Sequence, residues 1–265
     1  MLCENIFFDG SGTIYIIEPN KNDIAIDKFC SCESRTPLEG QFAYFNGDIN
    51  STILQGSIVN GGNSSVSNGM ISNYFGSESI SETNISNCIS RGCTAFQLLL
   101  RYHKSITKVS FCNFESLIAT HARVNAFYHT PVLFERCNYI NNSQSGVYSN
   151  GIFTAVGNYN FNILDSVFKN NKMKYLFEAV QDAKIYVIRS YIYDANVPNT
   201  GSVYTSEKET DLFNNDLKFI GLKPCEGDII VVFVRAKEEK ICSMHYPEYF
   251  HLYKYHLTIM LMNTM

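Results

Sequence analysis

The feature that most constrains this chain is a short apolar run that recurs along most of its 265 residues. The centres of successive runs are separated by 28, 28, 26, 31, 26, 24 and 26 residues. Such spacings are typical of repeat architectures, in which each unit packs only against its neighbours. The centres are Ile14, Phe42, Met70, Phe96, Phe127, Phe153, Phe177 and Val203. We therefore expect one elongated unit rather than several separate globular domains.

Two further apolar runs lie between most pairs of centres, as in Val132–Phe134 and Arg136–Tyr139 after Phe127. Their alternation of apolar and polar residues predicts half-buried strands, and the Asn, Ser and Gly between them predict turns. A coil of about 26 residues with three strands is the size of one turn of a parallel β-helix. The sequence thus predicts an all-β fold, a parallel β-helix of about eight three-stranded coils.

The expected β-helix covers residues 1–228, and residues 229–265 are expected to form a C-terminal cap strand and an irregular tail. Run 229–234 is continuously apolar, as in a strand that is covered on both sides. The alternative fold is an antiparallel sandwich or barrel of many short strands, which does not require a motif to recur in register.

Two internal ladders are expected from the repeat. The first places the phenylalanine centres on one face of the stack, namely Phe42, Phe96, Phe127, Phe153 and Phe177. The second comes from an aromatic residue followed three places later by Asn, in the pairs Tyr139 and Asn142, Phe168 and Asn171, and Tyr193 and Asn196. We expect these aromatic rings to point inward, and the Asn residues to adopt left-handed turn conformations and bond to one another.

This aromatic-x-x-Asn element, followed by an apolar strand, resembles the degenerate repeat of polymorphic outer membrane protein-like surface proteins. The resemblance covers residues 10–222 by periodicity, and by motif Tyr139–Asn142, Phe168–Asn171 and Tyr193–Asn196. It implies a right-handed parallel β-helix of the pectin lyase-like kind, displayed on a cell surface and used in adhesion.

The composition and the cysteines limit the partners. Charged residues make up 17% of the chain and the net charge is -4, which does not provide the basic surface that nucleic acid requires. No leader peptide and no apolar window of transmembrane length is recognised, and we expect a cell-surface location if the chain belongs to a longer protein. The nine cysteines include no two close pairs with zinc spacing, so we expect no metal and no cofactor.

Cys112 and Cys137 occupy equal places in neighbouring coils. A disulfide between them is one interpretation, and a column of small buried thiols is the favoured one. N-glycosylation acceptor motifs begin at Asn50, Asn63, Asn84 and Asn141.

A carbohydrate-cleaving site needs two carboxylates close in space. Asp165, Asp182 and Asp194 lie at unequal places in their coils, so no catalytic residue is predicted. The favoured function is a non-catalytic scaffold or recognition module of an adhesin-like surface protein, which binds a glycan or a protein. The alternative is a polysaccharide-active enzyme, pectate-lyase-like or a glycoside hydrolase, with a carboxylate site on one sheet face.

Overall fold

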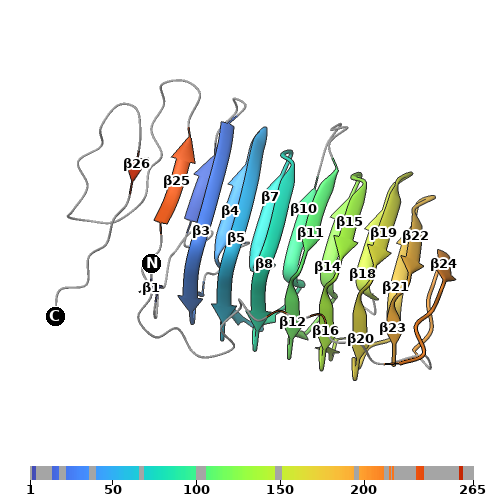
Figure 1. The fold of residues 1–265 in the computed structure, drawn as a ribbon. Helices are drawn as coiled ribbons and strands as arrows, with labels where there is room; N and C mark the ends of the chain where they lie inside the picture. The colour runs from blue at the N-terminus through green and yellow to red at the C-terminus, as the bar shows by residue number, and fades with distance from the viewer. Residues whose placement is uncertain are drawn as a thin grey trace.

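The computed structural model describes residues 2–3, 14–17, 22–35, 40–65, 69–99, 106–146, 151–193, 197–211, 215, 217, 231–235 and 257–258. Over these residues the chain contains strands and no helix, and the strands stack in parallel as a β-solenoid of about 6 turns (Figure 1). The expected all-β parallel solenoid is therefore confirmed. The number of turns is smaller than the eight coils that the sequence predicts.

The first wall of the solenoid is a seven-stranded parallel sheet built from the strands at the recurring centres. Its strands, in order, are β2 (Ile14–Ile17), β4 (Ala43–Asn46), β7 (Ile71–Tyr74), β10 (Cys93–Leu99), β14 (Arg123–Tyr128), β18 (Gly151–Val156) and β21 (Tyr175–Val180). Val203, the eighth predicted centre, does not continue this sheet. It pairs with Ile185 in a different sheet, so the last coil is incomplete and the turn count falls.

The second wall is a fifteen-stranded sheet that passes around a corner of each coil. In the first coils one long strand makes the corner, and in later coils two short strands do. The strands of this wall are β1 (Leu2–Cys3), β3 (Asn22–Cys32), β5 (Ile49–Val59), β8 (Glu78–Ser86), β11 (Thr107–Ser110), β12 (Asn113–Glu115), β15 (Val132–Glu135), β16 (Asn138–Ile140), β19 (Asn160–Leu164), β20 (Val167–Lys169), β22 (Lys184–Ile188), β23 (Tyr191–Ile192), β24 (Ser202–Ser206), β25 (Val231–Arg235) and β26 (Leu257–Thr258).

The corner is made by one residue per coil in the left-handed conformation. These residues are Gln55, Glu82, Phe111, Arg136, Asp165, Arg189 and Glu207, with φ between 46° and 54°. A single left-handed residue between two extended segments redirects the chain while the following strand keeps its pairing with the next coil. Because non-glycine side chains disfavour this conformation, the stack itself has to hold it.

A third, four-stranded sheet was not expected from the sequence. It consists of β6 (Gly62–Asn63), β9 (Ile89–Ser90), β13 (Ile118–Ala119) and β17 (Ser143–Gln144). The central coils therefore carry a fourth short strand, which corrects the prediction of three strands per coil. These strands are only two residues long, too short for an alternating pattern to appear in the sequence.

The C-terminal strand β25 caps the N-terminal end of the solenoid (Figure 1). It pairs antiparallel with β3, from Val231 opposite Asp27 to Arg235 opposite Asp23, and β26 covers its other edge. Run 229–234 thus includes a strand with partners on both sides, at the end of the stack where the chain begins. Apart from β26, residues 236–265 lie outside the described residues.

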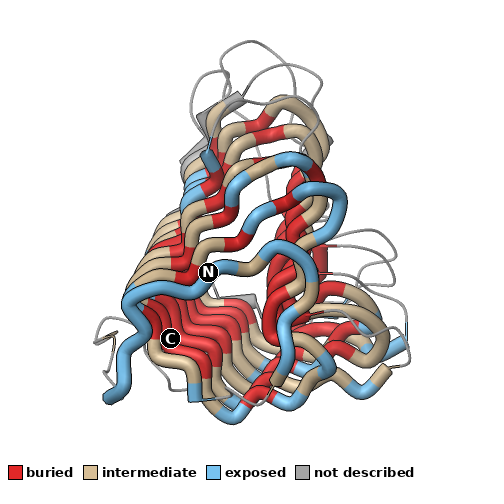
Figure 2. Tube along the Cα trace, turned by 90° about the vertical axis from the view of Figure 1, so that its right-hand side faces the viewer, coloured by how far each residue is buried: buried red, intermediate tan, exposed pale blue. Residues whose placement is uncertain are grey.

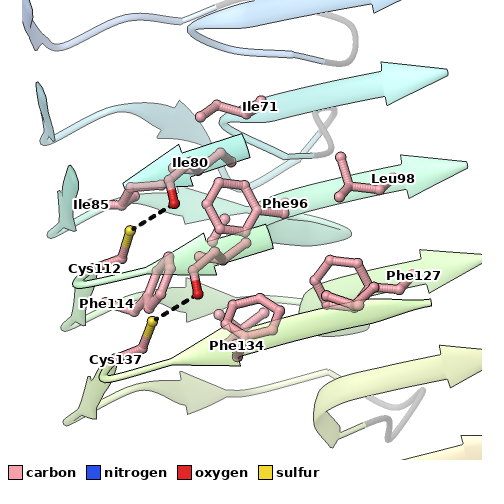
Figure 3. Packing of buried hydrophobic residues seen from close by; sticks show 14 of the residues in the cluster. Ile71, Ile80, Ile85, Phe96, Leu98, Cys112, Phe114, Phe127, Phe134 and Cys137 are labelled. Atoms are coloured by element: carbon pink, nitrogen blue, oxygen red, sulfur yellow. Dashed lines mark hydrogen bonds between the residues drawn. The ribbon is translucent and has the colours of Figure 1, made fainter. Parts of the chain in front are cut away.

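The core is a continuous column of apolar side chains inside the coils, seen end-on in Figure 2 as buried segments lying one behind another. Phe153 is its centre in the C-terminal half. Its ring lies 4.6 Å from the ring of Phe134 and 5.0 Å from that of Tyr139, measured between centroids. Figure 3 shows the neighbouring layers, where Phe96 and Phe127 of one wall face Ile80, Ile85 and Phe114 of the other wall.

The phenylalanine centres are all buried, but they do not form one column. Phe153 pairs with Phe177, whereas Phe96 pairs with Asn125, and Phe127 pairs with Leu98 and Ala155 in the neighbouring inward column. The pairing of β10 with β14 shifts between Cys93 and Phe96. Because of such irregularities, residues that are equally spaced in the sequence need not lie opposite each other in the sheet. Phe42 lies just before β4 and its ring stacks on Phe29 at 4.6 Å.

Candidate functional site

The asparagines of the aromatic-x-x-Asn motif form an internal amide ladder. The Asn142 Oδ1 accepts from the Leu117 amide at 2.9 Å and its Nδ2 donates to the Phe114 carbonyl at 3.0 Å. Asn171 repeats this one coil later, with its Oδ1 accepting from the Asn142 amide and its Nδ2 donating to the Tyr139 carbonyl. The two amides also bond to each other at 3.0 Å. The ladder joins successive turns and leaves no amide group for a ligand.

The sequence predicts the left-handed conformation for Asn142 and Asn171. In the structure the residue before each of them adopts it instead. Asn141 and Asn170 have φ of 56° and 58° and are exposed, while Asn142 and Asn171 point inward. Asn196 lies outside the described residues.

The aromatic members of the motif stack only in part as expected. The Phe114 and Tyr139 rings lie 4.5 Å apart and nearly parallel, and the Tyr139 and Phe168 rings 5.1 Å apart. Tyr193 is not in this column, because Ile192 pairs with Phe168 and Tyr193 follows it. A shift of one residue turns a strand side chain to the opposite face, and Tyr193 is accordingly 60% exposed.

Cys112 and Cys137 are free, buried thiols rather than a disulfide. Each directly follows a left-handed corner residue, and its Sγ donates to a carbonyl inside the coil, that of Ile80 for Cys112 and that of Val109 for Cys137 (Figure 3). Burial raises the pKa of the Cys112 thiol well above its usual value. The thiolate that metal binding or nucleophilic attack requires is therefore disfavoured at this position.

The four glycosylation motifs differ in accessibility. Asn141 is exposed, and Asn63 is half-buried with its Oδ1 accepting from the Ser65 hydroxyl at 2.8 Å. The Asn50 Nδ2 donates to Asp23 at 2.9 Å. Asn84 is 1% exposed and its Nδ2 donates to Ser57 and Ser86, so it is not an accessible acceptor in the folded chain.

The outer surface of the seven-stranded sheet carries a cluster that the sequence did not single out. We define the tyrosine face as Tyr44, Asn46, Tyr74, Gln97, Arg123, Tyr128, Thr154 and Glu178. Most of these side chains alternate along β4, β7, β10, β14, β18 and β21 with the buried inward residues, and all except the buried Thr154 are half-buried. They therefore form one lateral surface of the solenoid.

Hydrogen bonds fix the tyrosines of this face. The Tyr74 hydroxyl accepts from the Gln97 amide at 2.9 Å, and the Tyr44 and Tyr74 rings lie 5.5 Å apart. Two strands further on, the Tyr128 hydroxyl accepts from Arg123 at 2.8 Å, and the guanidinium lies 5.8 Å from the centre of the Tyr128 ring. These rings are held in place before any partner arrives, which lowers the entropy cost of binding.

The electrostatics around Tyr128 combine both signs of charge. Burial raises the pKa of the Tyr128 hydroxyl, and the positive charge of Arg123 opposes that rise. Glu178 acts in the same direction as burial, and its Oε2 accepts from Thr154 at 2.8 Å. The end of the face near β14, β18 and β21 thus holds a cation, a carboxylate and a phenol hydroxyl.

The structure places two of the three acids that the sequence analysis considered for hydrolysis. Asp165 makes two hydrogen bonds to Arg189, at 2.8 and 3.0 Å, and Asp182 is exposed in a turn. Asp194 lies outside the described residues. In the outward columns of the seven-stranded sheet, over the described residues, Glu178 is the one carboxylate.

Sequence spacing could not locate the tyrosine face. Its tyrosines follow the preceding apolar centre by two residues for Tyr44, four for Tyr74 and one for Tyr128. Only the strand register brings these offsets to one surface, because the entry point of each strand differs from coil to coil.

No protein-family model, curated protein or solved structure matches the chain. Across the parts of the chain that the structure describes, no helix is both long and apolar enough to cross a membrane. The same residues contain no group of three or more His, Cys, Asp or Glu side chains that could hold a metal ion.

Proposed function

We propose that this protein is a non-catalytic recognition module, and that its tyrosine face binds an extended glycan. The observation that carries the proposal is the row of rings fixed by hydrogen bonds on a lateral face, with Tyr74 held by Gln97 and Tyr128 held by Arg123. Tyrosine offers a rigid ring and a polar edge, so it contributes contact area at a small entropy cost.

Two features favour a glycan over a protein partner. The face extends across successive strands along the solenoid, from β4 to β21, which suits an elongated ligand. Beside the rings the face offers an amide, a cation and a carboxylate in Gln97, Arg123 and Glu178, which suit the hydroxyl groups of a sugar. The outward column of Tyr74 and Tyr128 also contains the apolar residues Leu99, Val156 and Val180. The resemblance to polymorphic outer membrane protein-like proteins extends this proposal to a cell-surface, adhesin-like role.

A binding role is favoured over hydrolysis because cleavage by paired carboxylates needs two acids near the scissile bond. Glu178 stands alone among the described outward positions of this sheet and already accepts from Thr154.

The test is binding of the purified chain to an array of immobilised glycans, followed by titration of the glycans that bind. Tyr74→Ala and Tyr128→Ala should each weaken binding about tenfold, as expected for removal of a central aromatic anchor. Tyr204→Ala is the matched control, because Tyr204 is an exposed tyrosine on another sheet, stacked on Tyr186. Equal affinities for all three variants, or binding only to protein ligands, would contradict the proposal.

A further inference from the structure

The interior of the third coil contains a polar cluster that the fold does not explain. Glu78 begins β8, is 2% exposed and points into the core. Ser51 pairs with Glu78 in the preceding coil, and Lys108 pairs with Ser79 in the following coil, which places Thr107 beside Glu78. Asn73 reaches this column from the opposite wall, since its Nδ2 donates to the Ser51 hydroxyl at 3.2 Å.

The oxygens of this cluster lack partners. Over the described residues, neither Glu78 oxygen, nor the Asn73 Oδ1, nor the Thr107 Oγ1 makes a hydrogen bond. Burial raises the pKa of the Glu78 carboxyl, and the nearby Ser51 hydroxyl opposes that rise without meeting the distance and angle of a full hydrogen bond. A buried acceptor without a partner is unfavourable, so several at one place favour the binding of a species that interacts with oxygen atoms.

The oxygen atoms of this cluster indicate which kind of species it would bind. Two oxygens come from Glu78 and one each from Asn73, Ser51 and Thr107, and carboxylate, amide and hydroxyl oxygens are the ligands of hard cations. The inward neighbours of the cluster carry no charge; they are Phe45, Ile53, Ile80, Leu98 and Val109. Once the Glu78 carboxyl has lost its proton, one positive charge balances it, and a monovalent ion supplies that charge without excess.

We propose that Glu78, Asn73, Ser51 and Thr107 form an interior binding site for a small monovalent cation of the size of sodium. The ion joins three successive coils, since its ligands come from β5, β7, β8 and β11. It also links the two walls of the solenoid near the turn between β7 and β8, so it acts as a structural staple.

The test compares denaturant unfolding of the full chain in sodium chloride and in choline chloride at equal ionic strength and pH 9, where the Glu78 carboxyl is ionised. The midpoint should be higher in sodium. Above the dissociation constant, the unfolding equilibrium constant should fall about tenfold for each tenfold rise in sodium. Lithium and potassium chloride then define the size preference.

Glu78→Gln should abolish the difference between sodium and choline. Glu82→Gln should retain it, because Glu82 belongs to the same strand but lies outside, where it accepts from Gln55 at 2.8 Å. Identical midpoints in the two salts, or a sodium effect that survives in Glu78→Gln, would overturn the proposal. Should Glu78→Gln not fold, sodium-23 relaxation of the unaltered chain decides, since a bound ion broadens the signal and an empty site leaves it at the buffer value.

Discussion

The interior around Phe153 and the interior around Glu78 belong to the same stack and hold polar groups in opposite ways. Near Phe153, the buried amides of Asn142 and Asn171 lie at a turn, where each bonds to the backbone of the preceding coil. Near Glu78, the polar side chains lie within strands, whose backbone groups are already paired in the sheet. A solenoid therefore satisfies polar residues at its turns, and requires something else where they face inward from a strand.

The largest expected change in stability comes from the aromatic interior around Phe153. Phe153→Ala should lower the free energy of unfolding by about 3–5 kcal/mol, because the ring contacts several others and its removal leaves a cavity. Chemical denaturation measures the loss. Phe111→Ala, at the corner where Arg136 covers the ring at 5.4 Å, is the control with a smaller loss. A loss below about 1 kcal/mol for Phe153→Ala would contradict the tight aromatic packing around that ring.

The next effect concerns pH at the Glu78 cluster, measured in choline chloride. Burial raises the pKa of Glu78 from 4.5 to about 8 in the folded chain. Between these values the folded state holds a proton that the unfolded state has released. This contribution to stability is fully present below pH 4.5 and is lost as the pH rises through 8, by about 3 kcal/mol or more.

Glu78→Gln should remove this component of the pH dependence, leaving a flatter profile of unfolding free energy. An unaltered chain whose stability rises steadily from pH 5 to 8 would show that Glu78 is ionised when buried.

A smaller loss of stability is expected when the amide ladder of Asn142 and Asn171 is broken. Asn171→Ala should cost about 2 kcal/mol, because it leaves the buried Asn142 amide without its partner and removes a hydrogen bond to the Tyr139 carbonyl. Asn170→Gly is the matched control, since it removes the adjacent exposed side chain and suits the left-handed backbone at that position. Comparable losses for the two variants, measured by thermal unfolding, would count against the structural role of the ladder.

The smallest effect is expected at the inner column beside the corner. Cys137→Ser should change stability by less than about 1 kcal/mol. Ser166 and Ser190 already occupy the same place in later coils and donate to the carbonyls two residues back, at 2.8 and 3.0 Å. Cys137→Leu should be clearly worse, by about 1–3 kcal/mol, because the corner has no room for a larger side chain. A melting-temperature series on the two variants separates these outcomes.

The sequence predicted this fold well because a solenoid is defined by repetition, which is visible along the chain. Tyr139 and Phe168 could be placed in one column because both are followed by the same turn, with Asn three residues later. Tyr193 begins the same motif but its side chain lies outside. The reason is the register of the strands, in which Ile192 rather than Tyr193 pairs with Phe168.

The chain by itself therefore determined the architecture, because period-two strands and Asn- or Ser-rich turns at intervals of about 26 residues leave few folds other than a stacked β-coil. The tertiary structure decided everything that depends on register. It brought Tyr74 and Tyr128 to one outer face and Ser51, Glu78 and Thr107 to one inner column. The physical reason is that a displacement of one residue in a strand exchanges its inner and outer faces, and spacing in a sequence with irregular loops does not fix that displacement.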